Sequence, residues 1–259
     1  MRTLTGSEVH LQLLGDWFLT VDGECGVLPA HASVELPSGP QHLIAFLALN
    51  GRCPRTHAAA TLWPDHTDHV AANRLRAVLW RLRHRHAGLP PLLEITDFSL
   101  ALASDVVVDV HRLRTAADRL IRGTGEPDEQ TAAAVLDSAE LLPGWYDDWV
   151  LAARERLQHL RLGALDALAA IRRTQQRRHE ALQAARAATR IEPLHESAHR
   201  TIARTHLDNG DIVEAVEHYE RFQAMLECEL GLPPSQQFTD LIRPYLQGAR
   251  PRRRVVRIR

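Results

Sequence analysis

Two segments of this chain, 34 residues apart, share one pattern of small and apolar side chains, and this repeat restricts the fold more than any other feature. The sequence EALQAARAATRIEP occupies residues 180–193, and EAVEHYERFQAMLE occupies residues 214–227. Before the second copy, residues 198–211 end in a Gly-Asp turn of the kind that joins two helices. Repeats of this length indicate helical hairpins that bury their apolar faces by stacking on one another. The chain from about residue 110 to residue 247 is therefore predicted to be all-helical.

The length of the period is that of tetratricopeptide-like repeats. One period earlier, residues 162–176 supply the first helix of a preceding unit. Two partial units cannot form a stable stack by themselves, so residues 110–149 are expected to add two or three helices. Arrays of this kind bind partners or dimerise, and histidine and tyrosine side chains inside them are expected to be core residues, not catalytic ones.

The first 109 residues are organised differently, as strands, then three helices, then a hairpin. Residues 9–23 are strand-like, alternating apolar and polar residues up to an Asp-Gly turn. The other expected elements are a strand at 33–37, helices at 40–50, 55–63 and 68–86, and strands at 92–96 and 99–103 joined by Asp97 and Phe98. This is the order of a winged helix-turn-helix preceded by a small sheet.

The predicted fold class is therefore mostly α, with an α+β N-terminal part. Residues 1–109 form a winged helix-turn-helix domain, and residues 110–247 form an all-α, tetratricopeptide-like domain. Residues 248–259 form a basic tail, and because the last ten residues hold six arginines and no acidic residue, we expect a solvated, disordered end.

Positive charge is gathered in the third predicted helix, although the formal net charge of the chain is only −1. Residues 71–86, AANRLRAVLWRLRHRH, hold five arginines and no acidic residue. The first 109 residues as a whole hold 8 arginines against 11 acidic residues. Local contrast of this kind is typical of proteins that bind nucleic acid.

Helical spacing separates this segment into faces. It places Leu75, Val78, Leu79 and Leu82 on one face and Asn73, Ala77, Trp80 and His84 on the opposite one. Arg74, Arg81 and Arg85 lie along one flank, and Arg76 and Arg83 along the other. A helix in a DNA major groove needs arginines that reach phosphates at its edges and small or hydrogen-bonding groups toward the bases. The alternative is an ordinary amphipathic helix with a solvated basic face, although such helices usually carry acidic residues for ion pairs. The candidate DNA-binding residues are Asn73, Arg74, Arg76, Ala77, Trp80, Arg81, Arg83 and His84; Trp80 could stack on DNA, on the wing or on a second copy.

Other kinds of chemistry have little support in the sequence. No phosphate-binding GxxxxGK and no GxSxG is present, and no catalytic residue, cofactor or enzyme activity is predicted. His66 and His69 have a spacing that could hold a metal, but Asp68 between them is expected to be an N-cap, so no metal site is predicted. The fifteen histidines are not concentrated in one place. Three scattered cysteines, the lack of a signal peptide and apolar runs that are too short to span a bilayer favour a cytoplasmic protein without a membrane partner.

Residues 52–86 resemble the DNA-binding domain of the Streptomyces antibiotic regulatory protein family. The resemblance lies in Leu62, Trp63, Ala71, Asn73, Leu75, Arg81, Leu82 and Arg83. The segments VVVDVHRLRTAADRL, WYDDWVLAARERLQHLRLGALDAL and ELGLPPSQQFTDLIRPYL resemble the start, middle and end of the family's bacterial transcriptional activation domain. The similarity covers about residues 9–247 in family order. Departures are an insertion at 24–31, the wing turn at 96–98, and Arg74, Arg76 and Trp80 at positions that are usually small or uncharged.

The resemblance implies an OmpR-type winged helix that activates transcription of pathway genes, of the antibiotic or secondary-metabolite type. It also implies binding to direct repeats of double-stranded DNA, contact with RNA polymerase and self-association on DNA, in a cytoplasmic, nucleoid-associated protein. Without a nucleotide-binding or sensor domain, the chain would be a short form of the family. The alternative function is a helical-repeat interaction module whose winged helix does not bind DNA.

Overall fold

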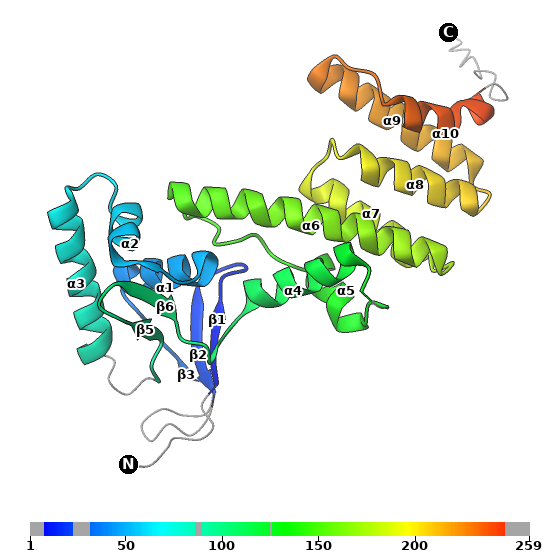
Figure 1. The fold of residues 1–259 in the computed structure, drawn as a ribbon. Helices are drawn as coiled ribbons and strands as arrows, with labels where there is room; N and C mark the ends of the chain where they lie inside the picture. The colour runs from blue at the N-terminus through cyan, green and yellow to red at the C-terminus, as the bar shows by residue number, and fades with distance from the viewer. Residues whose placement is uncertain (1–7, 23–31, 86–89, 125, 247–259) are drawn as a thin grey trace, which may run out of the picture. The chain divides into compact units, whose positions relative to one another are not determined.

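The computed structural model describes residues 8–22, 32–85, 90–124 and 126–246 (Figure 1). It divides into two compact units. The first unit contains Met1–Ala116 and Asp137–Leu157, and the second contains Ala117–Leu136 and Gln158–Arg259. This division differs from the expected boundary after residue 109, because residues 137–157 pack with the N-terminal part. The expected basic tail and the insertion at 24–31 lie outside the described residues.

A four-stranded sheet opens the first unit, with the strand order β3-β2-β1-β7. Its strands are β1 (Glu8–Gln12), β2 (Phe18–Asp22), β3 (Ala32–Ser33) and β7 (Val106–Val108). Strand β1 runs antiparallel to β2 and parallel to β7. The prediction of one strand-like stretch up to residue 23 is wrong, because the chain turns back at Gly15, whose φ of 86° favours glycine. The expected strand at 33–37 is also shorter, since β3 ends at Ser33.

Three helices and a hairpin follow, as the sequence predicts, and the hairpin is extended into a second small sheet by a third strand, β4 (Cys53–Pro54), that the sequence did not predict. The helices are α1 (Ser38–Asn50), α2 (Arg55–Leu62) and α3 (Asp68–Arg85), and the sheet has the order β4-β6-β5, formed by β4, β5 (Leu93–Ile95) and β6 (Ser99–Leu102). Strands β5 and β6 form the antiparallel hairpin of a winged helix. The fold class is therefore confirmed as mostly α with small sheets.

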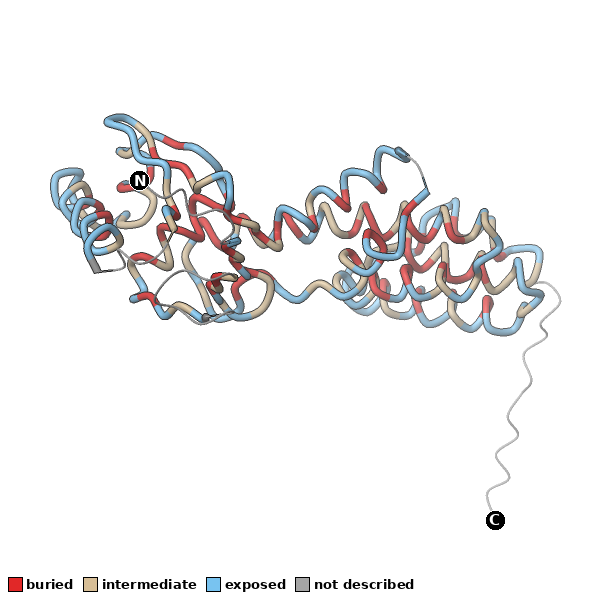
Figure 2. The backbone as a smooth tube through the Cα atoms, turned by 90° about the horizontal axis from the view of Figure 1, so that it is seen from below, coloured by how far each residue is buried: buried red, intermediate tan, exposed pale blue. Residues whose placement is uncertain are grey.

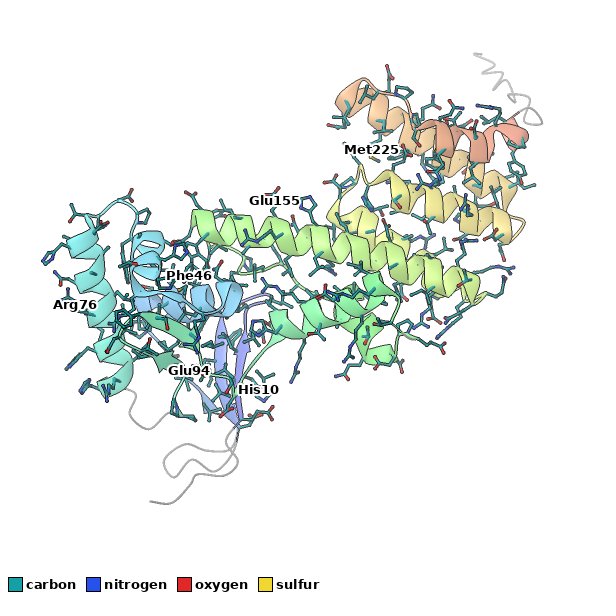
Figure 3. The ribbon with its side chains drawn as sticks, viewed as in Figure 1. His10, Phe46, Arg76, Glu94, Glu155 and Met225 are labelled. Carbon is teal, nitrogen blue, oxygen red and sulfur yellow. The ribbon has the colours of Figure 1, made fainter. Side chains whose placement is uncertain are left out.

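Helix α1 forms the core of the first unit. Its residues Leu43–Leu49 are all at most 5% exposed, as expected of a helix that is apolar on every side. The helix packs against α2, α3 and β6, and Phe46 is labelled on it in Figure 3. The ring of Trp149 lies edge-on to Phe46 at 5.5 Å, and Trp145 stacks on His42 at 4.1 Å. These two tryptophans explain why residues 137–157 belong to the first unit.

Asp109 fixes the turn between β1 and β2. Its carboxylate accepts hydrogen bonds from the backbone N–H groups of Leu13, Leu14 and Val110 at 2.7–3.1 Å. Burial raises the pKa of this carboxyl, and the backbone hydrogen bonds oppose that rise. The residue therefore has a structural role at the start of the next helix.

The second unit is built from helices. Along the chain these are α4 (Asp109–Arg122), α5 (Glu129–Leu136), α6 (Asp148–Thr174), α7 (Arg178–Ile191), α8 (Glu196–Asp208), α9 (Ile212–Leu230) and α10 (Gln236–Leu246), of which α4 and α6 begin in the first unit. Successive helices from α7 to α10 pack on one another. Figure 2 shows the buried sides of these helices facing inward. Among the described residues, no helix is long and apolar enough to cross a membrane.

The 34-residue repeat is visible in the packing of α7 and α9. The matched pairs are Ala181 with Ala215, Ala185 with Tyr219, and Ala188 with Phe222, and all six residues are at most 4% exposed. Small alanines on α7 let the neighbouring helix approach closely, whereas the larger rings on α9 pack against Phe238 of α10. Equivalent positions in the two segments therefore bury equivalent faces.

Candidate nucleic-acid interface

Helix α3 begins where the sequence predicts, but its N-cap differs from the expectation. The carbonyl of Thr67 accepts the first helical hydrogen bond, from Ala71 N–H at 2.9 Å. Thr67 is therefore the N-cap, and Asp68 is the first helical residue, where its charge is favourable to the helix dipole. In the described part of the chain, no group of three or more His, Cys, Asp or Glu side chains could hold a metal ion.

The inner face of α3 is fixed against the rest of the winged helix. Leu75, Val78 and Leu79 are 2–7% exposed, and Leu82 is partly buried, in agreement with the predicted apolar stripe. Gly39 of α1 lies so close that an added Cβ atom would be 3.2 Å from a methyl group of Val78. This close contact lies on the buried side of α3, and the opposite side faces solvent.

The outer face of α3 carries every residue that the sequence singled out as a candidate for DNA binding. All of them are exposed: Asn73, Arg74, Arg76, Ala77, Trp80, Arg81, Arg83 and His84. Figure 3 shows Arg76 on the outer side of the helix. The side chain of Arg85 lies outside the described residues. The structure therefore brings the candidate residues together on one surface.

The arginines of this surface differ from several arginines elsewhere in the fold, which are paired with acidic side chains. No carboxylate of the described residues lies within ion-pair distance of Arg74, Arg76, Arg81 or Arg83. By contrast, Arg154 pairs with Glu140 at 3.0 Å, and the buried Arg172 pairs with Glu180 at 3.1 Å. The guanidinium groups of Arg74, Arg76, Arg81 and Arg83 thus keep their donors available for an external anion.

Trp80 stacks on a neighbouring side chain of the same helix. Its ring and that of His84 are 4.8 Å apart with an angle of 20° between their planes. The Nδ1–H of His84 donates to the Trp80 carbonyl at 2.9 Å, which holds the imidazole in place. The indole remains 56% exposed, so the wing does not cover it.

The wing turn is held by side chains that sequence reasoning missed. The backbone N–H of Arg55 donates to the Phe98 carbonyl at 3.0 Å, and its guanidinium contacts the Thr96 carbonyl at 3.4 Å. Thr96 Oγ1 accepts a hydrogen bond from Ser99 N–H at 2.9 Å, and Arg52 forms an ion pair with Glu94, labelled in Figure 3. Phe98, at the tip, is 85% exposed. In the sequence, the apolar Phe98 in a short hairpin connection was the signal that could have identified this exposed wing tip.

Four histidines gather in the second unit, contrary to the expectation that nothing concentrates them. These are His195, His199, His206 and His218, at the start of α8 and along α8 and α9. His199 donates through Nε2–H to the Pro193 carbonyl at 2.9 Å, so its Nδ1 accepts from Nε2–H of His218 at 3.0 Å. Burial lowers the pKa of both rings, that of His218 to about 4. Both rings are therefore neutral near pH 7 and act as packing groups.

Comparison with known proteins agrees with this architecture. No curated protein matches the chain. Among solved structures, the chain is similar to Mycobacterium tuberculosis EmbR in complex with low affinity phosphopeptide, with a TM-score of 0.70 and 17% sequence identity over 95% of this chain and 67% of that one. At this identity the likeness shows a shared fold.

A family match identifies more than half of the sequence. Residues 108–244 match the bacterial transcriptional activator domain. This range contains the helices α4 to α9 and most of α10. It begins at the last residue of β7, after the winged helix with its exposed basic face. The chain therefore belongs to the bacterial transcriptional activator domain family.

Proposed function

We propose that this protein is a sequence-specific DNA-binding transcriptional activator, and that α3 is the helix that enters the major groove. Family membership supports a role in transcription. The observation that carries the DNA-binding part is the outer face of α3, where four exposed arginines lack a carboxylate partner among the described residues. These four arginines also lie in one stretch, residues 71–86, that contains no acidic residue, a local charge contrast typical of proteins that bind nucleic acid.

The geometry of α3 suits a groove. Its 18 residues form a rod of about 27 Å, and the major groove is about 12 Å wide, enough for one helix. Arginines on both flanks would reach phosphates on either side. Asn73 would face a base edge, where its amide can pair with adenine, and the small side chain of Ala77 would let the backbone approach.

The remaining parts of the function are inferred from the resemblance of the sequence to antibiotic regulatory proteins. A single winged helix contacts only a short site. Two self-associating copies bound to direct repeats would contact a longer sequence and so separate the specific site from the many non-specific sites of a genome. Surfaces of the second unit would contact RNA polymerase. We infer that the regulated genes belong to a secondary-metabolite pathway and that the protein acts in the cytoplasm at the nucleoid.

Selection of duplexes from a random library by the full chain tests the proposal, followed by affinity measurements over a salt series. If about 5 to 8 phosphates are neutralised, log K should fall with log[salt] with a slope of about −5 to −7. Arg81→Ala should weaken binding to all duplexes about equally and reduce the slope by about 1. The matched control is Arg190→Ala, which removes an exposed arginine from α7 and should leave binding unchanged. Binding that is insensitive to salt, or equal losses in the two variants, would refute the proposal.

A further inference from the structure

The chain has five tryptophans, and all of them lie in the described residues. Trp80 differs from the other four in its exposure. It is 56% exposed, whereas Trp17, Trp63 and Trp145 are partly buried and Trp149 is buried. The four others contribute to packing in the first unit. Trp80, the exposed tryptophan in the middle of the outer face of α3, is therefore expected to contact a partner outside the chain.

The indole is held in a defined orientation. Stacking against His84, which is itself bonded through Nδ1–H to the Trp80 carbonyl, restricts the rotation of both rings. Helical spacing places Trp80 in one stripe with Asn73, Ala77 and His84. Ala77, one turn away, occupies little space, so the indole is the largest group that this stripe presents.

The chemistry of the major groove limits what such a ring can contact there. Base edges in this groove present hydrogen-bond donors and acceptors and one apolar group, the 5-methyl of thymine. The face of an indole is apolar and has no acceptor, and its single donor lies at the ring edge. The 5-methyl group is thus the feature of the groove floor that matches an indole face.

We infer that Trp80 determines specificity by contacting the 5-methyl group of a thymine in the bound site. This rests on the proposed function, because it requires α3 to lie in the major groove. Asn73 and Trp80 are about 10 Å apart along the helix, so the bound sequence should contain a thymine about three base pairs from the position that Asn73 contacts, at a fixed spacing within each repeat. Arg74, Arg76, Arg81 and Arg83 would supply affinity without this preference.

Uracil scanning tests the inference, since uracil lacks only the methyl group and keeps the base pairing of thymine. Each thymine of a duplex selected by the full chain is replaced in turn, and dissociation constants are measured by fluorescence anisotropy at fixed salt. One position per repeat should show about four-fold weaker binding by the wild type, the value expected for one buried methyl group. Trp80→Ala should bind the thymine and uracil duplexes equally, whereas Trp80→Phe should keep the difference.

Tyr146→Ala serves as the matched control, because Tyr146 is a 77% exposed aromatic residue of the same unit that lies outside α3. At the sensitive position it should bind the uracil duplex more weakly than the thymine duplex, to the same extent as the wild type. The inference is overturned if no uracil duplex binds the wild type more weakly, or if Trp80→Ala retains the loss at the same position. If the library yields no enriched duplex, the proposed function itself fails; enrichment without methyl sensitivity overturns the role of Trp80 alone.

Discussion

Lowering the pH from 7.5 to 5 should weaken the second unit through its buried histidine pair. The two rings share one hydrogen bond, and His199 also stacks on Phe222 at 4.2 Å. Burial lowers the pKa of both, and the positive charges of Arg221 and Arg186 act in the same direction on His218. The folded state therefore resists protonation at both sites.

The sign follows from proton linkage. Below a pH of about 6.5 the unfolded chain binds protons at these histidines, but the folded chain does so at His218 only near pH 4. The stabilisation is thus present above about pH 6.5 and is lost as the pH falls toward about 4. Between pH 7.5 and 5, His218 alone should reduce the free energy of unfolding by about 1–2 kcal/mol, where the lower value allows for the part of the ring that solvent reaches.

His218→Gln isolates the effect, because the glutamine amide can still donate to His199 Nδ1 but does not titrate. Urea unfolding followed by far-UV circular dichroism at pH 7.5, 6.5 and 5 should give a shallower pH dependence for the variant than for the wild type. His179→Gln, at an exposed position of α7, is the control and should follow the wild type. All five tryptophans lie in the first unit, so their fluorescence monitors that unit in the same samples. Identical pH dependences for His218→Gln and the wild type would refute the reasoning.

Three further changes test the packing. His195 Nε2–H donates to Asp166 at 2.8 Å and its pKa is raised by this bond, so its contribution is present below about pH 6.5 and is lost at higher pH. In thermal unfolding, His195→Gln should thus cost more stability at pH 5.5 than at pH 8.5, and an equal cost at both would contradict this. Phe222→Ala, at a fully buried position, should lower the free energy of unfolding by about 3–5 kcal/mol in urea. The control Glu220→Ala, at an exposed position of the same helix, should change it by less than about 0.5 kcal/mol. Equally small effects of both changes would argue against the packing of α9. A fragment 1–109 lacks Trp145 and Trp149, which pack on α1, and should melt at a lower temperature than a fragment 1–157, so equal melting temperatures would count against the first unit as defined.

Local patterns in the sequence were sufficient for the elements that depend on their own periodicity. The apolar stripe of α3 at Leu75, Val78 and Leu79 is buried as predicted, because a helix with one apolar face has one way to cover it. The repeat positions Ala185 and Tyr219 are buried for the same reason. The β1–β2 hairpin was missed because its alternation of residues continues through Gly15, and a single glycine does not reveal that the chain reverses there.

The candidate DNA-binding residues were predicted individually, but the state of their side chains was not. Sequence spacing placed Arg81 and Asn73 on the outer surface of a helix, and the structure agrees. That Trp80 stacks on His84, and that Arg55 holds the wing turn, depends on rotamers and on contacts between residues far apart in the chain. Whether these side chains contact DNA stays a prediction.

The sequence by itself determined the helical repeat, the order of the winged-helix elements and the basic face of α3, because each arises from spacing within one segment. Only the tertiary structure decided that residues 137–157 belong to the first unit, since Trp145 and Trp149 find their partners on α1, about a hundred residues earlier. Tertiary structure also decided that His199 and His218 form a neutral pair. Their ionisation depends on burial by neighbouring helices, which is a property of the packed fold and is absent from any local pattern.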